Sequence, residues 1–168
     1  DMPSKGTHSF SAFTASVLQL RPESTGYLSL KSPNYLDHPV IHPNYLATDT
    51  DCRTIVKGVQ IARKIASHKP LKDHVLEEYA PGLDVPIDDE EGTWDWVRST
   101  AVTIYHPTGT CKMGTDGMSV VSPTLKVRGV EGLRVADASI MPKITSGNTN
   151  APAIMIGEKA SDLILKEA

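Results

Sequence analysis

The spacing of hydrophobic positions changes along the chain, and this change predicts where helices and strands lie. Between residues 48 and 67, apolar side chains recur every three or four positions, at Ile55, Val59, Ala62 and 65–66. This spacing is typical of a surface helix with one buried stripe. Threonines before its first turn can serve as N-caps, and acidic residues crowd that turn. The pattern therefore predicts a helix over 48–67.

Two further helices are predicted downstream. An acidic run at 88–91 precedes Trp94 and Val97, which indicates a short helix with an acidic first turn. Trp94 and Trp96 are two positions apart, so a helix would point them to different sides, and we expect one of them in the core. The last helix is expected to begin near Asn150 and to run to the end of the chain, with Pro152 in its first turn.

Strands are predicted where apolar residues alternate with polar ones or form short runs. Residues 27–31 alternate as in a half-buried strand, and residues 13–20 are predicted to form a strand before the turn at 21–26. A β-rich run covers 101–105, and two short strands flank the glycine turn at 129–132. The second of them, 133–136, resembles a central strand of an α/β sheet.

Composition excludes several classes of function. The chain has 168 residues, enough for one domain or a piece of a larger one, and a net charge of −3 with scattered basic residues. Neither nucleic acid nor an anionic membrane is an expected partner, and no run of apolar residues is long enough for a membrane span. Two distant cysteines and six dispersed histidines make no metal-ligand spacing. The compartment stays open.

His106 is the candidate base. Proline follows it, which favours an extended backbone, and two glycines within the next eight residues allow a sharp turn. This combination predicts an imidazole held at the end of a strand. Imidazole is the side chain best suited to take a proton near neutral pH. The alternative is a histidine that only packs into the turn.

Two other candidates precede the last helix. Asn148 lies just before it, and either Asn148 or Asn150 can cap it. The start of this helix can also aim its N–H groups and positive dipole end at an electron-rich ligand. Asp137 follows the predicted strand 133–136, where ligands gather in α/β sheets. Its carboxylate is expected either to bind a ligand hydroxyl or to cap the next turn.

Taken together, these motifs resemble the C-terminal part of the glucose–methanol–choline oxidoreductase family of FAD enzymes, and in particular its choline-dehydrogenase-like alcohol dehydrogenases. They occur in the family's order and cover the chain from about residue 13 to its end. The motifs are LRPESTG at 20–26, PNYL at 43–46, HPTGTCKMG at 106–114, VRGVEGLRVAD at 127–137 and GNTNAP at 147–152.

The resemblance implies a fold of the α/β (α+β) class in two parts. Residues 1–105 would belong mostly to a substrate-binding domain with an antiparallel sheet and helices. Residues 106–168 would supply the active-site loop and the last strand and helix of a Rossmann-like FAD-binding domain. His106 would be the catalytic base and Asn148 its partner. The residues implied to contact FAD are Asp137, Ala138, Asn150, Ala151 and Pro152.

One feature of such enzymes is missing from the sequence. No Gly-x-Gly occurs, so the glycine-rich turn that cradles the FAD phosphates is absent. The first residue is Asp1 rather than methionine, and no signal-like start follows. We therefore expect a C-terminal fragment or subunit, nicked or separately encoded, that is active only with an N-terminal FAD-binding partner chain.

The implied reaction is oxidation of a small-molecule alcohol to an aldehyde, by proton abstraction and hydride transfer to flavin N5. Two alternatives stay open. One is a hydroxynitrile lyase on the same fold, and the other is a partner subunit that has lost catalysis. The sequence does not distinguish an oxidase from a dehydrogenase, does not identify the alcohol, and does not show whether FAD is covalently attached.

Overall fold

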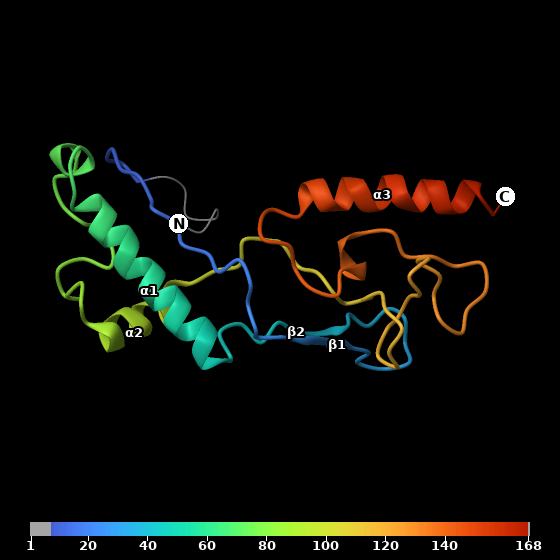
Figure 1. Cartoon of the computed structure of the whole chain (residues 1–168). Helices are drawn as coiled ribbons and strands as arrows, with labels where there is room; N and C mark the ends of the chain where they lie inside the picture. The colour runs from blue at the N-terminus through green and yellow to red at the C-terminus, as the bar shows by residue number, and fades with distance from the viewer. Residues whose placement is uncertain (1–7, 168) are drawn as a thin grey trace. The chain divides into compact units, whose positions relative to one another are not determined.

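The computed structural model describes residues 8–167, which form two compact units. The first unit combines residues 8–18 with Cys52–Thr100, and the second combines Gln19–Asp51 with 101–167. Helices and short strands are mixed (Figure 1), in agreement with the predicted fold class. This division is by compactness, so the proposed boundary between a substrate domain and an FAD domain near residue 105 stays a prediction.

Two α-helices dominate the first unit. They are α1, Asp49–Ala66, whose first three residues belong to the second unit, and α2, Glu90–Thr100; a short 3-10 helix, η2, covers Leu71–His74. Val56 of α1 and Val97 of α2 are buried. Gly58 lets α1 lie close to the N-terminal segment, because a Cβ there would lie 2.3 Å from Val17 Cγ1 unless one of them moved. The helix predicted over 48–67 is confirmed within one residue at each end, and the predicted short helix with an acidic first turn is confirmed as α2.

An ion pair fastens the loop after η2 to α1. The guanidinium of Arg63 donates two hydrogen bonds to the Glu78 carboxylate, at 2.8 and 2.7 Å, and the Arg63 side chain is only 11% exposed. A bidentate pair with little solvent around it is held more firmly than an exposed one.

Trp94 and Trp96 are both half-buried, so the prediction that one of them lies in the core is wrong.

The second unit contains a small hairpin. Strands β1, Tyr27–Ser29, and β2, Val40–His42, pair antiparallel with Leu28 opposite Ile41. All six residues are exposed, so β1 confirms the predicted strand near residue 27 but not its half-buried character. A sheet of two strands buries neither face unless another element packs on it.

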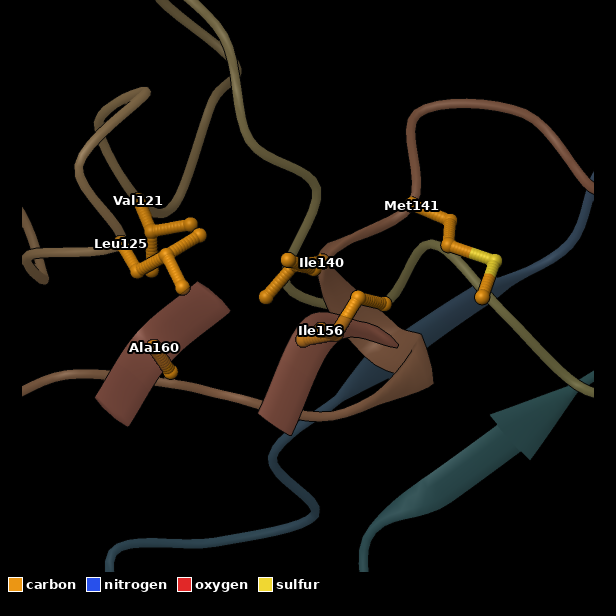
Figure 2. Packing of buried hydrophobic residues seen from close by; sticks show 6 residues of the cluster. All are labelled: Val121, Leu125, Ile140, Met141, Ile156 and Ala160. Carbon is orange, nitrogen blue, oxygen red and sulfur yellow. The ribbon is translucent and has the colours of Figure 1, made fainter. Parts of the chain in front are cut away.

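The core of the second unit lies against α3, Asn150–Leu165, and the 3-10 helix η3, Ala138–Ile140. In Figure 1, α3 (red) lies alongside the orange segment that contains η3. Ile156 and Ala160, four residues apart on one face of α3, contribute to this core together with Ile140 (Figure 2). The complete set of buried core residues is Val121, Leu125, Ile140, Met141, Ile156 and Ala160.

Four predicted strands are not formed in the part of the chain that the structure describes. Residues 13–20 and 101–105 have no ladder, and the strands around the 129–132 turn reduce to isolated bridges, such as Lys126 with Arg134. The turn itself is correct. A strand exists only where a neighbouring strand accepts and donates its backbone hydrogen bonds, and the alternation of side chains does not supply that neighbour.

Candidate active site

The loop that begins at His106 is fixed to η3 by backbone hydrogen bonds. Cys111 N donates to Ser139 O at 2.9 Å, and Met113 N donates to Ile140 O at 2.8 Å. Gly109 has a φ of 87°, and a Cβ there would approach Met141 O to 3.3 Å. Glycine is therefore required at this turn. Because η3 packs on α3, the loop is held in a fixed position relative to the start of that helix.

His106 is half-buried and contacts the residue just before α3. Its Nδ1 lies 2.9 Å from Oγ1 of Thr149, across 43 positions of sequence. Within residues 8–167, this is the one hydrogen bond of the imidazole, and Nε2 has no hydrogen-bond partner there. No strand ends at His106, which corrects that detail of the prediction. The ring is held through one nitrogen, and the other nitrogen is available to a ligand.

Asn148 precedes the residue that binds His106. Its side chain is exposed and makes no hydrogen bond to any other residue in the described range. The structure thus brings His106 to the residue adjacent to Asn148. The convergence of imidazole and amide on one substrate atom stays a prediction.

The first turn of α3 is open. It has no acidic residue, and Thr149, its N-cap residue, makes no side-chain cap hydrogen bond. Neither Asn148 nor Asn150 caps the helix, so the capping alternative for these asparagines is wrong. Asn150 and Ala151 are exposed, and Pro152 is half-buried. An uncapped helix start of this length presents N–H donors and partial positive charge to a ligand.

Asp137 begins the segment that leads into η3. Its Oδ1 accepts a hydrogen bond from Ser139 N at 2.7 Å, which confirms the capping role. Hydrogen bonds from the Ser139 side chain and backbone lower the pKa of Asp137 and outweigh the effect of burial. The carboxylate therefore stays ionised near neutral pH. Ala138, the first residue of η3, is half-buried.

Two classes of site are not seen in the described residues. No group of three or more histidine, cysteine, aspartate or glutamate side chains is arranged to hold a metal ion. No helix there combines the length and the apolar character that crossing a bilayer requires.

Residues 22–157 match the family described as GMC oxidoreductase. This match covers most of the chain and includes the His106 loop, Asp137 and the start of α3. The chain belongs to the GMC oxidoreductase family. The resemblance found in the sequence motifs is thereby confirmed.

Curated relatives of this GMC chain include alcohol and choline dehydrogenases. An alcohol dehydrogenase [acceptor] of Pseudomonas putida is 46% identical over 92% of the chain and 28% of its own length. The mitochondrial choline dehydrogenase of Mus musculus is 47% identical over 91% of the chain and 26% of its own length. The chain thus spans about a quarter of the length of these relatives.

Solved structures agree with the GMC assignment. The chain is similar to a pyridoxine 4-oxidase from Mesorbium loti, with a TM-score of 0.78 and 31% identity, covering 85% of this chain and 28% of that one. It is also similar to a formate oxidase of Aspergillus oryzae, studied for its FAD modification, with a TM-score of 0.81 and 31% identity over 88% and 26% of the two chains. FAD, the predicted cofactor, is confirmed at the level of the family.

Thr149 is the residue of this GMC site that sequence reasoning did not single out. A threonine before a helix is a common N-cap, so its residue type suggests a structural role. The signal for another role is the contact with His106, and that contact joins segments 43 residues apart. Only the fold makes it visible.

Proposed function

We propose that the chain is the C-terminal part of an FAD-dependent enzyme that oxidises an alcohol to an aldehyde. The observation that carries this proposal is the hydrogen bond between Thr149 Oγ1 and His106 Nδ1, which leaves Nε2 available as the base. The chain is also similar to an alcohol dehydrogenase and to choline dehydrogenases. Choline and simple primary alcohols are therefore the substrates to test first.

In the proposed mechanism His106 accepts the hydroxyl proton. An alcohol is too weak an acid to lose this proton to water at neutral pH, so a positioned base is required. The imidazole takes the proton at Nε2, while the Asn148 amide donates a hydrogen bond to the same oxygen and stabilises its developing negative charge. The two groups act on one atom, so their spacing decides the rate.

The residues around the start of α3 fit an isoalloxazine ring. Asn150 and Ala151 are exposed at a helix start without a side-chain cap, so their N–H groups suit an electron-rich carbonyl edge. The ionised Asp137 suits a ribityl hydroxyl. Ala138 and Pro152 would contact the ring or its chain. When bound, FAD supplies the acceptor at N5 for the hydride that leaves the substrate carbon.

The remaining parts of the cofactor site are proposed to come from an N-terminal FAD-binding segment or chain. The chain spans 26–28% of its dehydrogenase relatives and contains no Gly-x-Gly turn for the FAD phosphates. It also exposes large apolar side chains of the second unit, including Leu30, Tyr35 and Leu36. Apolar surface of this extent is usually covered by another part of the protein.

The visible spectrum of the assembled protein tests the proposal. The purified complex should be yellow, and anaerobic addition of choline or a primary alcohol should bleach the flavin and yield an equal amount of aldehyde. A flavin that stays oxidised while a cyanohydrin is cleaved would show a lyase instead. Material that binds no flavin, with every tightly bound chain retained, would show a non-catalytic subunit.

A further inference from the structure

We infer that Thr149 is a positioning residue that selects the tautomer of His106, so that Nε2 carries the lone pair that accepts the substrate proton. The inference rests on the proposed function and deepens it, since it assigns a residue through which the base is prepared. It starts from the contact of 2.9 Å between Thr149 Oγ1 and His106 Nδ1.

A neutral imidazole carries its proton on only one nitrogen, and the hydrogen bond made by one nitrogen decides the state of the other. In water, neutral histidine mostly carries the proton on Nε2, and in that state Nε2 cannot act as a base. An acceptor at Nδ1 favours the other tautomer. Since Nδ1 of His106 lies against a hydroxyl oxygen and Nε2 has no hydrogen-bond partner among residues 8–167, Thr149 is placed to be that acceptor.

The hydroxyl of Thr149 does not cap the helix that follows it, although capping is the usual function of a threonine at this position. It precedes α3 as the N-cap residue, but its side chain caps no backbone N–H. Thr149 is only 9% exposed, so water competes little for the hydroxyl. The helix is anchored instead by Ile156 and Ala160 in the core. The start of α3 therefore does not use this hydroxyl, which can form its hydrogen bond with His106.

The same contact supports the ring after proton transfer. The O–H bond of the alcohol breaks, its proton forms a bond with Nε2, and the imidazole becomes a cation. The proton on Nδ1 does not move, and it continues to be donated to Oγ1 of Thr149. A hydrogen bond from a charged donor is stronger than one from a neutral donor, so the contact stabilises the product of this step more than its reactant.

The first test compares three variants in the assembled flavoprotein. Thr149→Val keeps the shape of the side chain but removes the acceptor, and Thr149→Ser keeps the hydroxyl. Thr48→Val makes the same change before α1, where the threonine Oγ1 accepts from Asp51 N instead. Under anaerobic single-turnover conditions, Thr149→Val should slow flavin reduction at least about tenfold, the order of one hydrogen bond.

The rate per bound flavin should stay within about threefold of wild type in Thr149→Ser and Thr48→Val. Substrate affinity should change little in all three variants, because Thr149 acts through His106 rather than on the substrate. A Thr149→Val enzyme as fast as wild type would overturn the inference. So would a Thr149→Ser enzyme as slow as Thr149→Val.

A double-mutant comparison separates this role from a structural one. Adding Thr149→Val to His106→Ala should cause no further loss in the rate per bound flavin, because the group through which Thr149 acts is gone. Additive losses would show that Thr149 supports the site in some other way. If His106→Ala itself has no effect, the proposed function fails; if only Thr149→Val has none, this inference fails alone.

The second test does not depend on activity or on the folding of the Val variant. Nitrogen NMR of wild-type protein with ¹⁵N-labelled histidine rings reports the tautomer directly, and the His106 signals are those lost in His106→Ala. The inference expects a proton on Nδ1 and a bare Nε2 in the resting enzyme. A proton on Nε2 in neutral wild-type His106 would overturn it.

Discussion

The starts of α1 and α3 are built in opposite ways. At α1, two acids lie in the first turn, and Asp51 is buried and accepts from Glu23 N at 2.9 Å and Ser24 N at 2.7 Å. Thr48 caps this helix through Asp51 N. At α3, no acid or side-chain cap is present, and the threonine hydroxyl is directed to His106 instead. A helix start whose polar groups are bonded within the protein stabilises the fold, whereas one with unbonded N–H groups is available to a ligand.

The charge of Asp51 is a direct consequence of the closed arrangement. Burial raises the pKa of Asp51, but hydrogen bonds from the Ser24 side chain and from the backbone of Glu23 and Ser24 outweigh it and lower the pKa from 3.8 to about 2. Because the pKa in the folded state is below its ordinary value, the carboxylate stabilises the fold above pH 3.8. This contribution is lost as the pH falls towards about 2.

The largest effect on stability is expected from Asp51→Asn. Loss of the Asp51 carboxylate should lower the free energy of unfolding by about 2 kcal/mol at pH 7, because the ionised group accepts several hydrogen bonds in a buried place. Denaturant unfolding of the assembled protein measures this, and the gap to wild type should shrink below pH 3.8. Asp49→Asn, an exposed acid of the same turn, is the matched control and should cost less than about 1 kcal/mol.

Equal losses in the two variants would contradict the contrast between a buried anchor and an exposed helix charge. Loss of flavin reduction per bound flavin in Asp51→Asn would also contradict it, since the start of α1 is assigned to the fold alone.

A smaller effect is expected when the open helix start is given a charge. Asn150→Asp changes one amide to a carboxylate of the same shape in the first turn of α3. It should weaken FAD binding about tenfold, or about 1.4 kcal/mol, because the acid takes the place at the positive end of the helix that the flavin edge would occupy. Titration of the apoprotein with FAD measures the change.

Asn150→Ser is the neutral control for this experiment and should bind FAD nearly as wild type does. If the serine variant loses as much affinity as the aspartate variant, the effect is not electrostatic. If the aspartate variant binds more tightly, the start of α3 does not face the flavin.

The helices could be predicted from sequence because their signals are local. The apolar stripe of α1, the acids before α2 and Pro152 at the start of α3 each act within a few turns of one chain segment. Strands failed for the opposite reason. Residues 133–136 have the composition of a central strand, yet in the described structure only the single bridge between Lys126 and Arg134 forms there, since a strand requires a partner.

The residues of the candidate site also divide into those with local sequence signals, which were predicted, and those with long-range contacts, which were not. His106 and Asp137 were found from local turn chemistry and from family motifs, and the cap that Asp137 makes was one of its two predicted roles. Thr149 was not found, because its role depends on a loop 43 residues earlier being tied to η3 and thereby to α3. The buried anchor at Asp51 was missed for a similar reason, since its partners lie 27 and 28 positions away.

The central claim is that His106 is the base in a flavin-dependent alcohol oxidation. Anaerobic stopped-flow measurement of flavin reduction, on His106→Ala with bound flavin, tests it most directly. His68→Ala is the matched control, because His68 is exposed and its imidazole contacts Lys64 O and Ser67 Oγ at the C-terminal end of α1. The account predicts a rate lower by about 10²–10⁴ for His106→Ala and an unchanged rate for His68→Ala. Reduction by His106→Ala at the wild-type rate would contradict it.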